Sequence, residues 1–447
     1  MTILTRSLAT ASLAAFGWVS AATGQDVVLE VSATQPEYFA QDRAIWDLYE
    51  DENPGVAIEL FSINEDTEAA YQARVAGGDP ADMRSLVFPT KDNYQTYLNL
   101  AEIDFPWWDL MTYDAKTIFE QTDGVAGYTP AINVRDGLVF NFVYYADKMA
   151  EAGLDPSSIR TVDELNAFLA DLKTHVEGDP DLEYVLDVGW HPRAWGRWIL
   201  EAWAIGLGAI KEDMRALWTG EIAWTDVDNN PLVPALELAK DYTEQGYFPP
   251  NWWNRAWEQE FEASFIAGRS ILAYHGPWIW NKTLAQRPDA DLAGFFFPAN
   301  EEGVIWQDST TADRGSALYV ANLDDENLEA AKDALYWWTS PEIVKLRAEA
   351  IGFVPAMDLS SVGGVELTNP QYVKLIKPAL DGQWGEITFD NSLGGQAAGG
   401  PLKKSGAPFV IEDNSVAPIM GQYMSGEMSL EEFLGIMQER YDEAYGS

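Results

Sequence analysis

A chain of 447 residues is too long for one hydrophobic core, so two lobes or domains are expected. The formal net charge of −43 repels phosphate backbones and anionic lipid surfaces, which argues against nucleic-acid binding and favours a solvated acidic surface. The sequence contains no cysteine, which excludes disulfides, thiolate metal sites, cysteine nucleophiles and a lipid-bearing N-terminal cysteine.

Residues 1–24 have the pattern of a secretory signal peptide. Arg6 is the only charged residue before Asp26, the stretch 8–19 is apolar, and small side chains follow over 20–24, where a signal peptidase could cut. The apolar stretch is too short to span a bilayer, and no later run of about 18 apolar residues occurs. We therefore expect export to a periplasm as a freely diffusing protein with no direct membrane insertion.

Strands and helices alternate over the next part of the chain. Apolar alternation predicts strands at 27–31, 56–60 and 86–88, and the stretches at 36–52 and 67–75 are predicted to be helices. This order is typical of a parallel doubly wound sheet, whose ligands bind beyond the carboxyl ends of the strands. Three polar residues follow these ends and are candidate ligand contacts: Gln35, Glu65 and Asp92.

Capping boxes mark two later helices. Thr161 can accept a hydrogen bond from the amide of Glu164, whose side chain reaches back, and apolar residues at helical spacing follow. Ser429 and Glu432 repeat this arrangement and predict a docked helix at the end of the chain. The stretch 124–145, which precedes the first of these helices, is apolar and rich in β-forming residues.

The stretch 261–280 predicts a compact module. It begins as a helix that Gly268 ends, continues as a short buried strand, and closes on a rigid turn that carries Trp278. Clefts in α/β folds usually lie at strand ends, so Trp278 is a candidate ligand contact. Two of its neighbours are expected to be structural: His275 and Trp280.

Aromatic residues are abundant, with 19 tryptophans, 19 tyrosines and 19 phenylalanines. The apolar face of a sugar ring stacks on an indole, and sugar hydroxyls need planar hydrogen-bonding partners. Aromatic residues beside polar loops therefore suit a neutral carbohydrate. Further aromatic candidates are Trp195, Trp252 and Trp253, and the leading polar candidates are Arg193, Asp313 and Arg314. Trp338 lies in a helical pattern and is expected to pack in the core.

Motifs for catalysis and metal binding are weak. His175, His191 and His275 lie far apart without the spacing of metal ligands, and no zinc-protease motif, nucleophile elbow or phosphate-binding glycine loop occurs. Asp226 begins a stretch that resembles a calcium loop, but Pro231 occupies the position where that loop needs glycine. We expect no enzymatic activity, no cofactor and no metal site.

Five segments, in order, resemble motifs of the carbohydrate-uptake, maltose-binding-like family of extracellular solute-binding proteins. They read NPGVAIEL at 53–60, YQARVAGGDPADM at 71–83, VFNFVYYADKMAEAGL at 139–154, FIAGRSILAYHGPW at 265–278 and AAKDALYWWTSPEIVKLRAEAIGFVP at 330–355. Each motif alone is loose, but their order makes the resemblance fairly specific, and it covers most of the chain.

The resemblance implies an α/β fold of the periplasmic-binding-protein type (class II-like), with two doubly wound lobes and a ligand cleft between them. The expected boundaries are 25–131 and 311–354 for lobe one, 141–308 and 357–447 for lobe two, and crossings near 132–140, 309–310 and 355–356. The absence of a Pro-, Gly- or Ser-rich linker between two independent halves agrees with interleaved lobes.

The resulting hypothesis is a monomeric binding protein that closes on a neutral sugar or oligosaccharide and delivers it to the permease subunits of an ABC importer. A polyol, a glycerol-phosphate compound or a uronate oligosaccharide is an alternative ligand that Lys91, Arg193 and Arg314 leave open. An exported glycoside hydrolase or lyase is a second alternative, because 71 acidic residues could supply a pair of catalytic carboxylates.

Overall fold

The computed structural model describes residues 27–446 with internal gaps, so the predicted signal peptide lies outside it. The residues within this range that are not described are 34–37, 63–64, 86–89, 113–124, 126, 130, 133, 137–140, 190–199, 277, 309–317, 324–326, 391–402, 405, 408–409 and 412–414.

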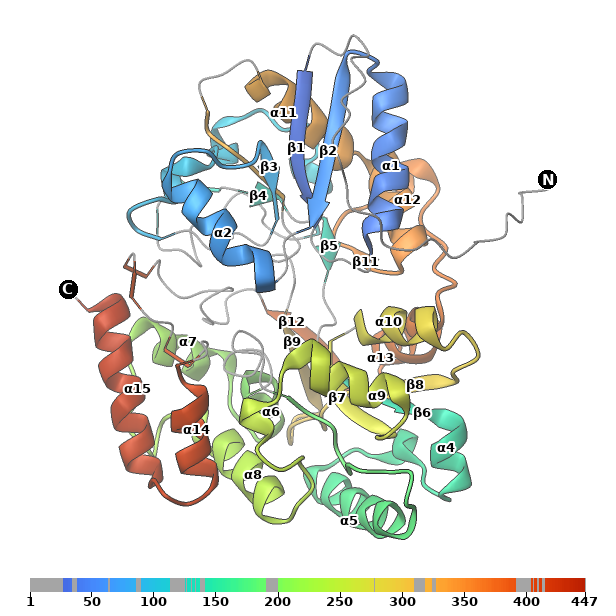
Figure 1. The fold of residues 1–447 in the computed structure, drawn as a ribbon, viewed down its shortest axis with the longest axis vertical. Helices are drawn as coiled ribbons and strands as arrows, with labels where there is room; N and C mark the ends of the chain where they lie inside the picture. The colour runs from blue at the N-terminus through green and yellow to red at the C-terminus, as the bar shows by residue number, and fades with distance from the viewer. Residues whose placement is uncertain are drawn as a thin grey trace.

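The chain forms two lobes, each built around its own sheet (Figure 1). Lobe one surrounds a five-stranded sheet of order β2-β1-β3-β10-β4. Its strands are β1 (Val27–Ala33), β2 (Val56–Ser62), β3 (Met83–Arg84), β4 (Ala131–Ile132) and β10 (Leu318–Val320). Strand β1 is parallel to β2 and β3, whereas β10 is antiparallel to β3 and β4. The predicted parallel pairing is therefore confirmed for the strands expected at 27–31 and 56–60, and β3 adds a further parallel neighbour of β1.

The core of lobe one follows from the predicted alternation of its first strand. Leu29 and Val31 are buried, while Val28 between them is exposed. The helices of this lobe are α1 (Phe39–Glu52), α2 (Glu65–Ala76), α11 (Asn327–Trp338) and α12 (Pro341–Ile351). Trp46 of α1 stacks on Trp338 of α11 with ring centroids 4.2 Å apart, which confirms that Trp338 packs in the core. The predicted third strand at 86–88 lies outside the described residues, and β3 is the described strand just before it.

Lobe two surrounds an antiparallel sheet of order β7-β6-β8. Its strands are β6 (Asn141–Tyr145), β7 (Leu272–His275) and β8 (Leu292–Phe295), and a parallel pair is formed by β9 (Val304–Asp308) and β12 (Glu386–Asp390). Two isolated parallel bridges, Tyr184 to Ser270 and Asp187 to Ala273, attach the segment 184–187 to the outer side of β7. The end of the β-rich stretch 124–145 thus forms β6, the centre of the second sheet.

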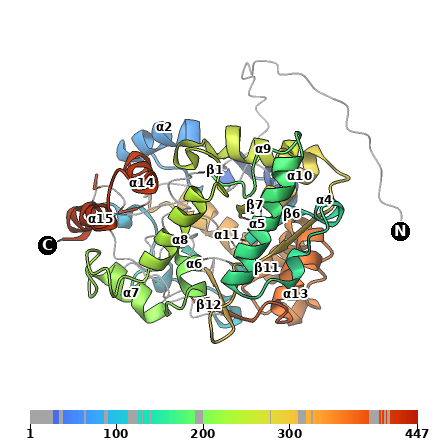
Figure 2. The same cartoon turned by 90° about the horizontal axis from the view of Figure 1, so that it is seen from below.

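Helices surround the sheet of lobe two, and α5 and α8 lie at the end of this lobe that points away from lobe one (Figures 1 and 2). They are α4 (Ala146–Glu151), α5 (Val162–Gly178), α6 (Leu200–Gly206), α7 (Lys211–Thr219), α8 (Val233–Glu244), α9 (Ala263–Ala267), α10 (Trp278–Gln286), α13 (Lys377–Leu380), α14 (Ala417–Met424) and α15 (Leu430–Tyr445). None of the helices in the described ranges is long and apolar enough to cross a membrane.

Both predicted capping boxes are present. The Thr161 hydroxyl accepts from the Glu164 amide at 3.2 Å, and the Glu164 carboxylate accepts from the Thr161 amide at 3.0 Å. Ser429 and Glu432 form the same reciprocal pair at 3.2 and 2.9 Å. These local bonds begin α5 and α15 at the residues that the sequence predicts.

The chain crosses between the lobes from β4 to β6 and from β9 to β10, and a short antiparallel pair, β5 (Arg135–Asp136) with β11 (Val354–Pro355), lies at these crossings. The predicted start of lobe two at residue 357 is wrong. Met357 forms a bridge with Met111, and Met357 and Leu359 pack with Val344 of α12 in lobe one. The chain joins the lobe-two core at about Tyr372, because Val362, Val365 and Leu367 before it still pack against the lobe-one cluster.

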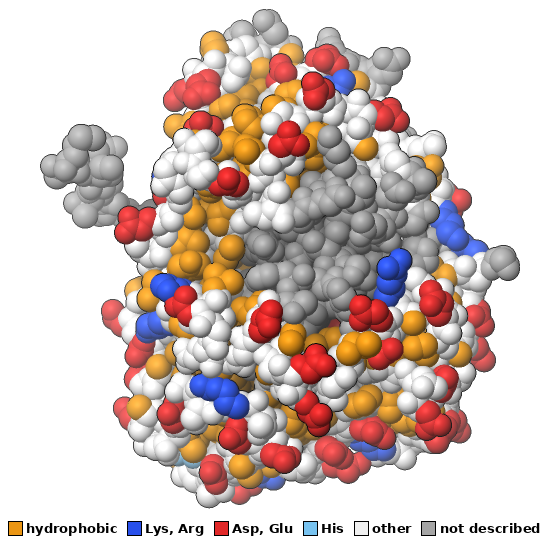
Figure 3. Space-filling model, turned by 180° about the vertical axis from the view of Figure 1, so that it is seen from behind, with side chains coloured by type: hydrophobic (Ala, Val, Ile, Leu, Met, Phe, Trp, Pro, Cys, Tyr) orange, Lys and Arg blue, Asp and Glu red, His pale blue; other side chains and the backbone are white. Residues whose placement is uncertain are grey.

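Acidic side chains are distributed over both lobes on the face that Figure 3 shows, and they do not gather into a single patch. This distribution agrees with the expectation of a solvated acidic surface.

Candidate functional site

The candidate site begins with the predicted module at 261–280. A π-helical turn (Trp257–Glu262) continues into α9, and Gly268 ends this helix with a left-handed φ of 78°. Strand β7 follows, and α10 then begins at Trp278. The predicted helix, glycine and strand are confirmed. The difference is that Trp278 occupies the first turn of a helix, whereas the sequence suggests the tip of a turn.

Two neighbours hold the Trp278 ring. A Cβ atom at Gly276 would lie 2.0 Å from Cζ3 of the indole, so the ring packs where only glycine leaves room. The indole Nε1 donates a hydrogen bond to Oε1 of Glu262 at 3.1 Å. Trp278 is only partly buried. The ring is therefore held at two points in a residue that remains partly exposed.

Glu262 is the centre of a buried polar group that we call the Glu262 cluster: Trp257, Glu262, His275, Trp278 and Lys282. Besides Trp278, Oε1 of Glu262 accepts from Nε1 of Trp257 at 3.0 Å and lies 3.2 Å from Nε2 of His275. Oε2 accepts from Nζ of Lys282 at 2.7 Å. The glutamate is almost fully buried and still has donors on both carboxylate oxygens.

The Glu262 cluster shifts the titration of its members. Burial alone would raise the pKa of Glu262, but the hydrogen bond and charge of His275 together with the charge of Lys282 outweigh it and lower this pKa to about 2. Burial lowers the pKa of His275, although the Glu262 carboxylate opposes that shift. His275 has no exposed surface and Trp280 is fully buried, which agrees with the structural roles expected for them.

Helix α10 lies on the side of lobe two that faces lobe one (Figure 1). Asn281, one turn after Trp278, donates a hydrogen bond through Nδ2 to the hydroxyl of Tyr38 at 3.2 Å, and Tyr38 stands at the start of α1 in lobe one. Residues three apart lie on the same side of a helix. Trp278 is therefore close to the boundary between the lobes.

A second contact between the lobes lies beside a predicted polar residue. The amide of Lys91 donates to the carbonyl of Lys403 at 3.1 Å, and the amide of the adjacent Lys404 donates to Ala444 of α15. Asp92 follows Lys91 directly and is exposed in the same turn. The structure thus brings Asp92 of lobe one to the lobe boundary, as it does Trp278 of lobe two.

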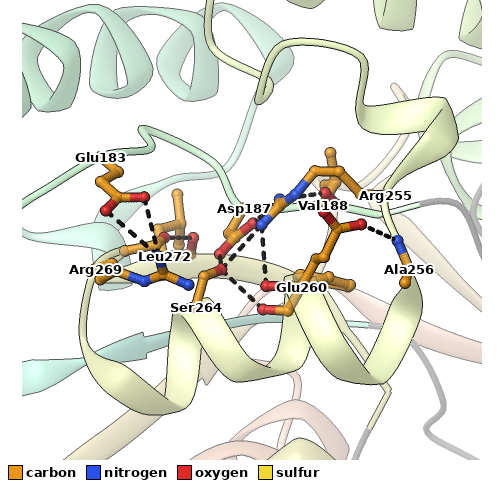
Figure 4. Close-up of polar contacts among 11 residues, drawn as sticks. Glu183, Asp187, Val188, Arg255, Ala256, Glu260, Ser264, Arg269 and Leu272 are labelled. Carbon is orange, nitrogen blue, oxygen red and sulfur yellow. Dashed lines mark hydrogen bonds and ion pairs between the residues drawn. The ribbon is translucent and has the colours of Figure 1, made fainter.

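A second buried polar group fixes the segment that leads to residue 190 (Figure 4). We call it the Asp187 cluster: Asp187, Arg255 and Ser264. Nη1 of Arg255 forms an ion pair with Asp187 and donates to the Val188 carbonyl at 2.8 Å, while the Ser264 hydroxyl donates to Asp187. Burial raises the pKa of the Asp187 carboxyl to about 6, against the opposing charge of Arg255. This cluster joins the segment 184–188 to α9.

The Asp187 cluster lies immediately before two predicted contacts. A Cβ atom at Gly189 would lie 2.8 Å from Cβ of Phe261, so the backbone packs closely against the π-helical turn up to this residue. Arg193 and Trp195 follow in the segment 190–199, which lies outside the described residues.

The structure separates the two adjacent tryptophan candidates. Trp252 has no exposed surface, and its Nε1 donates to the Thr243 hydroxyl at 3.0 Å. A ligand contact needs solvent-exposed surface, which Trp252 lacks, so Trp252 is not among the contacts that we propose. Trp253 is partly buried and packs against Gly421 of α14. Pattern alone could not separate the two, because both follow the same proline pair in the sequence.

The remaining predicted contacts have no described side chains. Glu65 is the first residue of α2, and the structure describes its backbone only. Five predicted contacts lie outside the described residues: Gln35, Arg193, Trp195, Asp313 and Arg314.

Sequence reasoning missed Glu262, Lys282, Tyr38 and Asn281. One usable signal is that Glu262 interrupts an apolar helix face next to Phe261, because a charge at such a position needs buried partners. The other three residues carry no comparable signal, since their partners lie far away in the chain. Within the described ranges, no group of three or more His, Cys, Asp or Glu side chains could hold a metal ion.

Comparison with known proteins adds the family. A family model described as bacterial extracellular solute-binding protein matches residues 44–364, well over half of the chain. The chain belongs to this family. Among curated proteins, no sequence matches this extracellular solute-binding protein.

Solved structures show the fold of this solute-binding protein. A chitin oligosaccharide binding protein is 20% identical with a TM-score of 0.70, and the match covers 95% of this chain and 100% of the other. RafE from Streptococcus pneumoniae, in its apo form, is 15% identical with a TM-score of 0.64, covering 94% and 98%. A sugar transporter from Bacillus licheniformis in complex with stachyose is 20% identical with a TM-score of 0.61, covering 92% and 98%. The predicted α/β fold of the periplasmic-binding-protein type is confirmed.

Proposed function

We propose that this solute-binding protein captures a neutral sugar or oligosaccharide between its lobes and delivers it to the permease subunits of an ABC importer. The observation that carries the proposal is Trp278, a partly exposed tryptophan at the lobe boundary whose indole is held by Gly276 and Glu262. Such a surface suits the C–H face of a sugar ring. Proteins of the same fold bind chitin oligosaccharide, raffinose and stachyose, which supports a carbohydrate ligand.

Each lobe contributes a different kind of contact to the sugar. Trp278 of lobe two stacks on the sugar, and Asp92 of lobe one accepts hydrogen bonds from its hydroxyls. Binding stabilises the closed arrangement because only that arrangement makes both sets of contacts, and β5 with β11 lies where the chain segments cross. Further proposed contacts, taken from the sequence alone, are Gln35, Glu65, Arg193, Trp195, Trp253, Asp313 and Arg314.

In the proposed function, the mature protein is a periplasmic monomer that catalyses no reaction. The family is extracellular, and the leader-like pattern of residues 1–24 supports export. The hydrogen bonds of Glu262 are taken up by indoles, a histidine and a lysine of its own lobe, so this carboxylate supports an aromatic surface and is not positioned for acid–base catalysis.

A thermal-shift screen over mono-, di- and oligosaccharides tests the proposal. A ligand that binds only the native state raises Tm, by an amount that corresponds to about 2.7 kcal/mol at a hundredfold excess over Kd. Trp278→Ala should lose most of that shift. Trp337→Ala is a matched control, because Trp337 is a partly buried tryptophan on α11 of lobe one. A flat Tm across the whole panel, or an undiminished shift in Trp278→Ala, contradicts the proposal.

A further inference from the structure

We propose that Glu262 is a positioning residue that sets the orientation of the Trp278 ring and thereby the affinity for the sugar. The inference rests on the proposed function, in which Trp278 is the stacking surface. Its basis is the juxtaposition of a buried carboxylate with the indole N–H of a partly exposed tryptophan at the lobe boundary.

Two restraints act on different parts of the indole. Gly276 lies against Cζ3 in the six-membered ring, and Glu262 accepts the hydrogen bond from Nε1 in the five-membered ring. The glycine sets how closely the ring approaches the backbone, and the rings of His275 and Trp257 pack beside the indole with centroids 5.1 and 6.1 Å away. Among these contacts, the hydrogen bond to Glu262 is the directional one, and it holds the five-membered ring in one orientation.

Glu262 is itself held in place by its other partners. Nζ of Lys282 binds Oε2 at 2.7 Å, and Nε1 of Trp257 binds Oε1 at 3.0 Å. Glu262 lies where the π-helical turn passes into α9, and Lys282 lies on α10. The carboxylate therefore links the helix that precedes β7 in the chain to the helix that follows it. A carboxylate restrained by bonds to both oxygens is a rigid acceptor for the Trp278 N–H.

A fixed ring improves binding by reducing the cost of ordering. A tryptophan that is already held in its bound orientation loses less conformational freedom when the sugar stacks on it, a saving that corresponds to up to about tenfold in affinity. The negative charge at the N–H also polarises the indole towards the ring face, which strengthens its attraction for the slightly positive C–H groups of a sugar.

The experiment compares Glu262→Gln with the wild-type chain. Glutamine keeps the shape of the side chain but removes the charge and places an amide donor among the groups that now donate to the carboxylate. In the ligand-free protein, the ¹H–¹⁵N resonance of the Trp278 indole, assigned with Trp278→Phe, should move upfield. Affinity for the sugar that gives the largest thermal shift, measured by calorimetry, should fall by about tenfold.

Glu201→Gln is the matched control. Glu201 is also a buried glutamate of lobe two, and its Oε1 accepts from the indole Nε1 of Trp218, which is fully buried. This variant should lower stability while leaving the Trp278 resonance in place and the sugar affinity within about twofold of wild type, because no new cost of ordering Trp278 arises. Equal losses of affinity in Glu201→Gln and Glu262→Gln overturn the proposal, since the effect would then be a general loosening of the lobe.

A measurement on the wild-type chain keeps the test decisive if Glu262→Gln does not fold. The Trp278 indole N–H should exchange with deuterium slowly although the residue is partly exposed, because the bond to Glu262 must open first. Exchange as fast as that of a free indole overturns the positioning role. If no sugar binds the wild-type chain, the proposed function fails, whereas the resonance and exchange of Trp278 still decide whether Glu262 orients the ring.

Discussion

Asp187 and Glu262 are two buried carboxylates of lobe two. Their pKa values shift in opposite directions. Glu262 belongs to the helical segment 257–267 and Asp187 contacts this segment through Ser264, two residues from Glu262. Asp187 faces one guanidinium and one hydroxyl, and burial raises its pKa to about 6. Glu262 faces two indoles, an imidazole and an ammonium group, and its pKa falls to about 2.

The difference shows that burial alone does not set the sign of a pKa shift. Desolvation disfavours the charged form of the carboxylate in both clusters. The hydrogen-bond donors and cations around each carboxylate decide whether their stabilisation of the charged form exceeds that cost. The clusters also support different parts of the proposed site. The Asp187 cluster holds the backbone that leads to Arg193 and Trp195, and the Glu262 cluster holds Trp278.

The largest expected effect comes from Arg255→Met, which leaves Asp187 buried without its cation. Removing one partner of a buried ion pair costs about 3–5 kcal/mol, and we expect about 3 kcal/mol because Asp187 can take up a proton. Lys282→Met should cost only about 1 kcal/mol, since Glu262 keeps its other donors and Lys282 is partly exposed. Urea unfolding at pH 7 measures both losses.

The double variant Arg255→Met with Asp187→Asn serves as the control for this comparison. It removes the unpaired charge and should recover part of the lost stability, as a double-mutant cycle would show. A loss below about 1 kcal/mol in the single Arg255→Met variant would mean that the Asp187 cluster does not depend on its ion pair.

An intermediate effect is a pH dependence of opposite sign in the two clusters. Folding raises the pKa of Asp187, so its contribution to stability is full below the ordinary aspartate value and is lost as the pH rises through about 6. Folding lowers the pKa of Glu262, so its contribution is full above the ordinary glutamate value and is lost as the pH falls towards about 2.

Unfolding free energies measured from acid to neutral pH check these signs. Relative to Asp187→Asn, the wild-type protein should lose stability as the pH rises from about 4 to 6. Relative to Glu262→Gln, it should gain stability as the pH rises from about 2 to 5. Two difference curves with the same slope would remove the contrast between the clusters.

The smallest effect is expected at the edge of the Asp187 cluster. Arg269 forms an ion pair with Glu183 at 3.4 Å, and both side chains are 44% exposed (Figure 4). Arg269→Gln should therefore change stability by less than about 1 kcal/mol, and 1 M salt should abolish the difference. Thermal unfolding at two salt concentrations measures it, and a loss as large as that of Arg255→Met would show that burial does not separate the two arginines.

Local patterns predicted much of the fold. The capping boxes at Thr161 and Ser429, the alternation in β1 and the glycine stop at Gly268 all involve residues within a few positions of one another. Their hydrogen bonds and steric limits are therefore written in short stretches of sequence. The candidate site was predicted less completely. Trp278 and Asp92 are found at the lobe boundary, but Trp252 is buried and Met357 packs in lobe one.

The sequence by itself determined several helices and strands, among them β1, β2, α5 and α15, and it placed Trp278 shortly after a buried strand. Only the tertiary structure decided what holds Trp278 and where the lobes meet. Glu262 meets Lys282 across 20 positions, Arg255 meets Asp187 across 68, and Asn281 meets Tyr38 across 243. The physical reason is that a buried charge finds its partners by packing between distant segments, for which local spacing contains no information.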